Sequence, residues 1–224
     1  MRVTSEQKTF WEANSYLLFR GLLAEQKDSL GQWVREVESW PDDFSRWLRF
    51  YEMDEPSQLS RIENFVPYHS GLAQVLQSGP LVGVISDLMG ERAVLYKDRI
   101  NFKLPGGGAH AAHQDGVAYE SGNLATFRPD VTPYVSVLIS VDRATLENGC
   151  LQVVPNWPLI KLEILRMERP FPEHPTFSKI AQSVEDRLEW LPIETDPGDV
   201  LLFTEIGLDR SEEHTSELQS LTNL

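Results

Sequence analysis

Apolar positions in the first 90 residues recur at helical spacing. Ser5 can cap a first helix that leads into the apolar stretch from Phe10 to Leu23. A second helix is predicted over about 27–40, and its apolar residues are Leu30, Trp33, Val34, Val37 and Trp40. Leu72 to Met89 predicts a further helix, interrupted around Gly79-Pro80. The N-terminal part is therefore predicted to be mostly helical.

Beyond about residue 90 the apolar period changes to two, which is typical of half-buried strands. Apolar residues alternate with polar ones over 99–104. From Tyr134 to Val141, four β-branched residues occupy one face and a less apolar set occupies the other. Two further β-type runs lie at Cys150–Val154 and Asp199–Phe203. Helices followed by short strands predict an α+β fold, with a small antiparallel barrel or jelly roll as its strand part.

Composition narrows the class of protein. With 41% hydrophobic residues, the 224-residue chain can bury the core of one domain. A formal net charge of −14 argues against a nucleic-acid partner or an anionic membrane surface, since both need a basic patch. Cys150 is the single cysteine, so an intrachain disulfide is excluded. No apolar signal segment or bilayer-length run is present, which predicts a cytoplasmic protein.

One stretch carries candidate chemistry: a strand ending near Leu104, three glycines, and then His113-Gln-Asp115. On an extended backbone, residues two apart point the same way, so His113 and Asp115 can converge on one metal ion. They would supply two thirds of the two-histidine, one-carboxylate set that holds non-haem Fe(II). The plainer interpretation is a chance His-x-Asp beside a tight glycine turn. His110 is placed in the loop rather than among the ligands.

Three motifs in order make the metal interpretation specific. They are Lys97 with Asn101-Phe-Lys-Leu-Pro-Gly-Gly-Gly108 before His113-Gln-Asp115, Asn148-Gly-Cys-Leu-Gln-Val-Val-Pro155, and Asp196-Pro-Gly-Asp-Val-Leu-Leu-Phe203. Together they resemble the phytanoyl-CoA dioxygenase family. The Lys-Leu-Pro-Gly-Gly-Gly motif is most similar to the family's phosphonate-hydroxylating branch. The residues Trp157-Pro158 depart from the family's usual continuation, which bears on the substrate side of the pocket.

The resemblance implies N-terminal helices followed by a double-stranded β-helix, or jelly roll. It also implies a site in which His113 and Asp115 bind Fe(II), 2-oxoglutarate is the cosubstrate, and dioxygen is activated. The implied reaction hydroxylates a C–H bond of a small organic substrate and decarboxylates 2-oxoglutarate to succinate. Asn101, Lys103, Tyr134 and Ser136 are expected to line the cofactor side of this site. The alternative is that they are ordinary polar groups of a strand face or core.

The family pattern breaks near the end of the chain. Where the resemblance implies a third ligand histidine, Asp209 stands, and the cation expected further on to pair with 2-oxoglutarate is missing after Arg210. Arg210 to Ser220 read as a translated sequencing adapter, against the alternative of a native polar tail. We therefore expect a truncated oxygenase domain over 1–209, helical to about 90 and jelly-roll over about 91–209, with an incomplete barrel. Residues 210–224 are expected to be a non-native tail, and the chain to be inactive.

Two rival functions remain at this point. One is a jelly-roll binding domain without turnover. The other is a cupin-like metalloprotein, although cupins normally supply more histidines to the metal than remain in this motif. A small-molecule substrate and dioxygen are the expected partners, with neither nucleic acid nor membrane.

Overall fold

The computed structural model describes residues 2–52, 55–105, 110–113, 134–156, 167–168, 179–180, 182–204, 207, 209–211 and 219–223. The helices are α1 (Ser5–Asn14), α2 (Lys27–Glu38), α3 (Ser70–Leu76), α4 (Gly79–Met89) and α6 (Gln182–Glu185), with 3-10 turns η1 (Ala24–Gln26) and η2 (Val66–Tyr68). The strands are β1 (Tyr16–Phe19), β2 (Leu48–Tyr51), β3 (Leu59–Glu63), β4 (Arg99–Lys103), β5 (His110–His113), β6 (Val135–Ser140), β7 (Gln152–Val153), β8 (Met167–Glu168), β9 (Lys179–Ile180), β10 (Leu191–Pro192), β11 (Val200–Thr204), β12 (Asp209–Ser211) and β13 (Gln219–Asn223).

The N-terminal region is less helical than the apolar spacing predicts. Thr4, rather than Ser5, caps α1, because its side chain accepts a hydrogen bond from the backbone of Gln7 in a capping box. The helix ends at Asn14, and Ser15 adopts a left-handed conformation. The following residues form β1, which pairs with β11. β2 and β3 also lie in the part predicted to be helical; tertiary pairing overrides the local pattern there.

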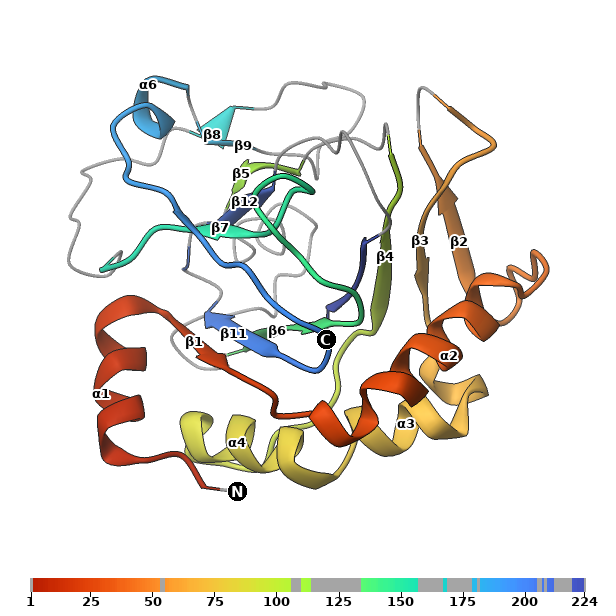
Figure 1. Ribbon diagram of the computed structural model, residues 1–224, viewed down its shortest axis with the longest axis horizontal. Helices are drawn as coiled ribbons and strands as arrows, with labels where there is room; N and C mark the ends of the chain where they lie inside the picture. Colours follow the sequence, from red (N-terminus) through yellow and green to blue (C-terminus); the bar gives the residue numbers. More distant parts are fainter. Residues whose placement is uncertain are drawn as a thin grey trace.

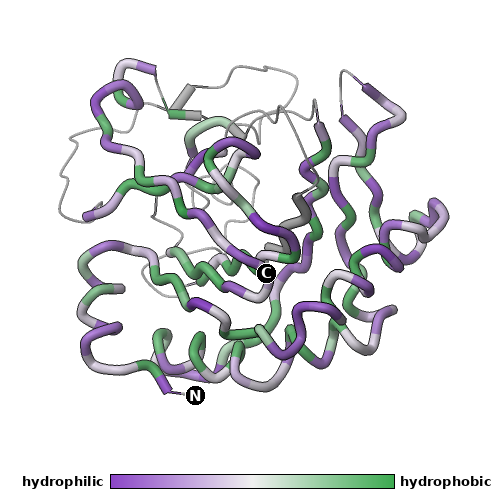
Figure 2. Tube along the Cα trace, viewed as in Figure 1, coloured by the Kyte–Doolittle hydropathy of each residue, from purple (hydrophilic) through white to green (hydrophobic). Residues whose placement is uncertain are grey.

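The helices predicted over 27–40 and 72–89 are confirmed, the second as α3 and α4 with a break at Gly79. α2, α3 and α4 run along one side of the large sheet (Figure 1). Most positions along α4 are hydrophobic (Figure 2). These helices share one buried core with the outer face of the sheet, through residues such as Leu81, Ile100 and Val137. No helix in the described ranges is long and apolar enough to cross a bilayer.

All the described strands except β8 and β9, which pair only with each other, form the two facing sheets of a jelly roll. The larger sheet has the order β1-β11-β6-β13-β4-β3-β2, and the smaller one has the order β10-β7-β12-β5. The predicted gap in the barrel is not observed in the described strands, because β13 lies between β4 and β6 and pairs antiparallel with both. Within the described strands, the slot between β4 and β6 is therefore filled. Backbone pairing alone can fill such a slot, since it depends little on side-chain identity.

The alternation predicted for β4 and β6 is confirmed. Val137 and Ile139 belong to the helix-side core, together with Ile100 and Phe102 of β4. Leu138 instead packs in a second cluster with residues of both sheets, so its face points into the barrel. Residues that alternate with the helix-side set on β4 and β6 therefore face the interior.

Candidate metal centre

His113 and Asp209 occupy paired positions on neighbouring strands of the smaller sheet. Nε2 of His113 lies 4.0 Å from Oδ2 of Asp209. The Asp209 residue is only 5% exposed, whereas His113 is partly buried. A metal ion that bonds nitrogen and oxygen at about 2.0–2.2 Å fits between two atoms at this separation. The fold thus brings an imidazole and a carboxylate to one point.

The His113 ring is held by its own strand. Its Nδ1 lies 2.8 Å from the carbonyl oxygen of Ala111. A carbonyl can only accept, so this contact assigns the proton to Nδ1 and leaves the lone pair of the neutral ring on Nε2. Nε2 is the nitrogen nearer Asp209. A hydrogen bond of this kind is the usual device that orients a metal-binding histidine.

The side chain of Lys103 crosses the barrel interior and buries its ammonium group there. Nζ of Lys103 donates a 2.8 Å hydrogen bond to Oγ of Ser211, so β4 of the larger sheet contacts β12 of the smaller one. Lys103 is 4% exposed. Burial lowers the pKa of Lys103 to about 8, and the nearby Glu52 carboxylate opposes that shift. A lysine in this setting is a ready partner for a carboxylate that enters the barrel.

The other predicted lining residues lie on the same interior faces. Asn101 is two positions from Lys103 on β4 and is 6% exposed. Ser136 is 6% exposed on β6, and its hydroxyl lies 3.4 Å from the phenol oxygen of the half-buried Tyr134. Their placement agrees with the predicted alternation. Their roles toward a cosubstrate stay predictions.

Asp115 falls outside the described residues, and so do Trp157 and Pro158. The predicted convergence of His113 and Asp115 therefore stays a prediction. Within the described part of the chain, no group of three histidine, cysteine or acidic side chains could hold a metal. The donor types that are described, one imidazole and one carboxylate, fit Fe(II). Cys150 is fully buried, as expected of a small apolar residue.

The resemblance places Asp209 where the family has its third ligand histidine, but the sequence does not predict the strand pairing that sets it beside His113. The only signal was its place after the β-type run that ends at Phe203, where the family pattern has a histidine. The structure gives this signal a physical meaning, because β11 is followed by β12, and β12 starts opposite His113. Position 209 therefore lies beside His113 on the neighbouring strand.

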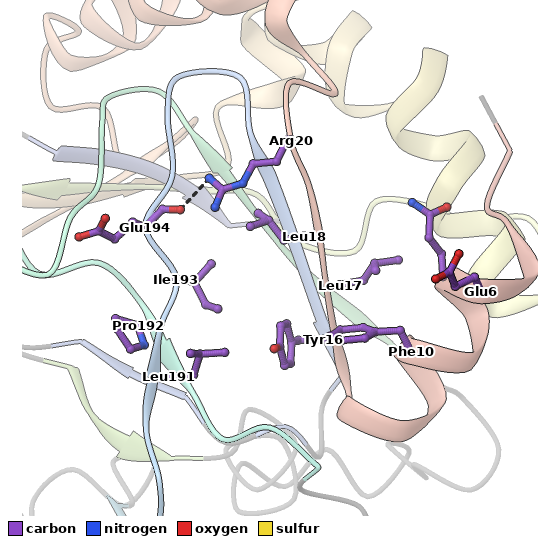
Figure 3. A pocket seen from close by; sticks show the side chains of 11 residues that line it. Glu6, Phe10, Tyr16, Leu17, Leu18, Arg20, Leu191, Pro192, Ile193 and Glu194 are labelled. Carbon is purple, nitrogen blue, oxygen red and sulfur yellow. Dashed lines mark hydrogen bonds between the residues drawn. The ribbon is translucent and has the colours of Figure 1, made fainter.

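A separate groove of about 540 Å³ lies between α1, β1 and β10 (Figure 3). Phe10, Tyr16 and Ile193 form its apolar part. Arg20 lies at one end, where its Nη1 donates to the carbonyl oxygen of Glu194. Among the described residues, neither His113 nor any predicted cofactor-lining residue lines this groove, so it lies apart from the His113–Asp209 pair.

The family model described as phytanoyl-CoA dioxygenase (PhyH) matches residues 11–217. A 2-aminoethylphosphonate dioxygenase of an uncultured bacterium (HF130_AEPn_1) is 33% identical over 223 residues, which are 96% of this chain and 77% of the relative. A methylphosphonate hydroxylase of Gimesia maris is 34% identical over 212 residues, covering 93% of this chain and 74% of the relative.

Solved structures of low identity show the same fold. EctD from S. alaskensis, crystallised with 2-oxoglutarate and 5-hydroxyectoine, superposes with a TM-score of 0.79 at 16% identity, over 99% of this chain and 75% of EctD. The 2-oxoglutarate-dependent carbocyclase SnoK from nogalamycin biosynthesis gives a TM-score of 0.69 at 16% identity, over 98% and 82% of the two chains. With the family match and these relatives, the chain belongs to the phytanoyl-CoA dioxygenase family of Fe(II)- and 2-oxoglutarate-dependent oxygenases.

Proposed function

We propose that this chain carries the family's site at the β5–β12 pairing and binds Fe(II) and 2-oxoglutarate there. The reaction for which the site is built is hydroxylation of a C–H bond of a small organic substrate, with decarboxylation of 2-oxoglutarate to succinate. The observation that carries the proposal is the placement of His113 Nε2 within 4.0 Å of the carboxylate at position 209. The single buried cysteine suits a reducing compartment, and we place the activity in the cytoplasm.

Different side chains of the protein would hold the metal ion and the cosubstrate. His113 offers Nε2 because Ala111 fixes the proton on Nδ1. Asp115 is the predicted carboxylate ligand, and position 209 is the third. Bound Fe(II) supplies open coordination positions for a chelating keto acid and for dioxygen. Lys103 provides the positive charge that a keto acid's carboxylate requires inside the barrel, with Asn101, Tyr134 and Ser136 lining the same interior.

We further propose that Asp209 makes this chain a weak enzyme. A carboxylate in place of the family's histidine gives the metal two anionic protein ligands, which changes its charge and potential. We also propose that residues 210–224 are foreign to the family's domain, since they include the adapter-like string, although the family model extends over the first part of them, to residue 217. β13 would then be a foreign strand that the sheet accepts through backbone pairing.

The second candidate function is a binding domain without turnover, and Asp209 is the observation that favours it. The two are separated by anaerobic titration with Fe(II) and 2-oxoglutarate, followed by the visible absorption band that appears when a keto acid chelates Fe(II). We expect the band in this chain at high Fe(II), and its loss in His113→Ala. A chain that binds Fe(II) without forming the band, even at saturating 2-oxoglutarate, would be the non-catalytic domain.

A further inference from the structure

Three cationic side chains surround one carboxylate on β3, the strand next to the edge strand β2 of the larger sheet. Glu63 is 7% exposed. Nε of Arg61 and Nε of Arg99 each lie 3.1 Å from its Oε1, and Nζ of Lys97 lies 3.0 Å from its Oε2. Among the described residues, Glu63 and the Glu52 carboxylate that also acts on Arg61 cannot neutralise three cations, so the cluster keeps a net positive charge. The chain as a whole carries −14, which makes the local excess distinctive.

The cluster continues the interior face of the barrel. Arg61 pairs in register with Asn101, and Glu63 pairs with Arg99, across β3 and β4. Ile62 and Ile100, which alternate with them, pack in the helix-side core. Arg61 therefore lies on the same side of the sheet as Asn101 and Lys103, about 5 Å across the strands from Asn101.

The orientation and surroundings of the Arg61 guanidinium suit it to bind an anion. Its guanidinium lies 4.1 Å from the ring centroid of Phe50, which fixes the plane of the group. Within the described residues its buried Nε makes no hydrogen bond, although Glu63 lies close by. Its side chain is 29% exposed, so the remaining guanidinium donors are accessible. Burial and the neighbouring charge of Arg99 lower the pKa of Arg61, with Glu63 and Glu52 opposing, so a bound anion would relieve unfavourable electrostatics.

We propose that Arg61, backed by Arg99 and Lys97, binds the anionic head of the substrate, and that this head is a phosphonate. A guanidinium matches two phosphonate oxygens at once, and the additional cations suit the second negative charge. Two relatives of this chain are named for phosphonate substrates. The assignment rests on the proposed oxygenase site next to it, because it makes the cluster the part that orients the substrate toward that site.

The test is calorimetric titration of the metal-free chain with methylphosphonate, which needs no turnover. Binding is compared for the original chain, Arg61→Gln, Arg61→Lys and Arg143→Gln. Arg143 is the matched control, since its side chain is 72% exposed and loses the same charge. Glu63 keeps Lys97 and Arg99 in every variant, so loss of Arg61 leaves no buried carboxylate unpaired. Circular dichroism checks that each variant is folded.

We expect methylphosphonate to bind at least tenfold more weakly to Arg61→Gln than to the original chain. Arg61→Lys should be intermediate, and Arg143→Gln unchanged. The proposal is overturned if methylphosphonate does not bind to the original chain, if it binds equally to Arg61→Gln, or if acetate binds equally well. Displacement of methylphosphonate by 2-oxoglutarate in an Arg61-dependent manner would also overturn it, by making Arg61 the keto-acid anchor. Because Fe(II) is absent, failure here differs from failure of the proposed function.

Discussion

The imidazole of His113 faces the carboxylate of Asp209 from a paired position on the neighbouring strand, with Nε2 and Oδ2 4.0 Å apart. We predict that His113→Ala weakens Fe(II) binding by at least about 100-fold, because loss of a metal ligand exceeds the roughly 10–100-fold cost of losing an outer hydrogen-bond partner. Isothermal titration with Fe(II) under anaerobic conditions measures this. His110→Ala is the control and should bind Fe(II) as the original chain does. Equal losses in both variants would contradict the ligand assignment.

The depressed pKa of Lys103 predicts a pH limit for 2-oxoglutarate binding. The protonated amine attracts the keto acid, and burial lowers its pKa to about 8. Affinity should therefore be constant below about pH 8 and then fall by up to about tenfold per pH unit, a window well below that of an exposed lysine. Titrations of 2-oxoglutarate between pH 7 and 9.5 provide the measurement. Lys103→Met should bind weakly at every pH; a falling affinity in that variant would assign the titration to another group.

Asp199 anchors the junction between β1 and β11. It is 4% exposed, and its carboxylate accepts hydrogen bonds from the backbone of Gly21 and Asp196 and from Arg20. Burial raises the pKa of Asp199, but these hydrogen bonds and the Arg20 charge outweigh it, so the pKa lies below its usual value. Its contribution to stability is therefore present above about pH 4 and lost as the pH falls further.

Asp199→Asn should lower the free energy of unfolding by about 2–3 kcal/mol at neutral pH, since charged hydrogen bonds are lost. Urea denaturation at pH 7 and pH 3 measures the effect, which should shrink at the lower pH. Asp196→Asn is the control, because that side chain is 74% exposed. A loss of equal size in both variants would show that the carboxylate at 199 has no special role.

Because β13 lies between β4 and β6, removing the end of the chain should destabilise the larger sheet. A chain ending at Ser211 would expose the facing edges of β4 and β6, which β13 otherwise covers. Open strand edges pair with other chains, so we expect a lower Tm and self-association at micromolar concentration. Light scattering and a thermal melt test this. An unchanged Tm and a monomeric shortened chain would mean that residues 219–223 contribute nothing to the sheet.

Much of the fold follows from local pattern. α2 and α4 could be predicted because their apolar faces repeat at helical spacing, and β4 and β6 because their period is two. β1 could not, because Tyr16–Phe19 is a short apolar run whose strand conformation depends on pairing with β11. β13 could not be predicted from the sequence for the same reason. Its polar sequence gives no strand signal, and its position is set by the slot between two other strands.

The candidate site was predictable in part. The inward orientation of Lys103 and Ser136 could be predicted from strand alternation, because the residues that alternate with them form the apolar face of each strand. The contact between Lys103 and Ser211 does not, since it joins residues from different sheets. Nor does the Arg61 cluster, whose members come from β3, β4 and the segment before β4. In the sequence, charged residues of a short strand look the same whether they form a buried cluster or a solvent-exposed face.

Succinate formation from 2-oxoglutarate with added Fe(II) tests the central claim that position 209 completes the ligand set beside His113. The original chain and Asp209→His are measured side by side, with a chain restored to a family-like sequence from residue 204 as reference. We predict little or no turnover by the original chain, at least tenfold more by Asp209→His, and the most by the restored chain. Turnover by the restored chain without any gain in Asp209→His would contradict the account, because position 209 would then not be a ligand position.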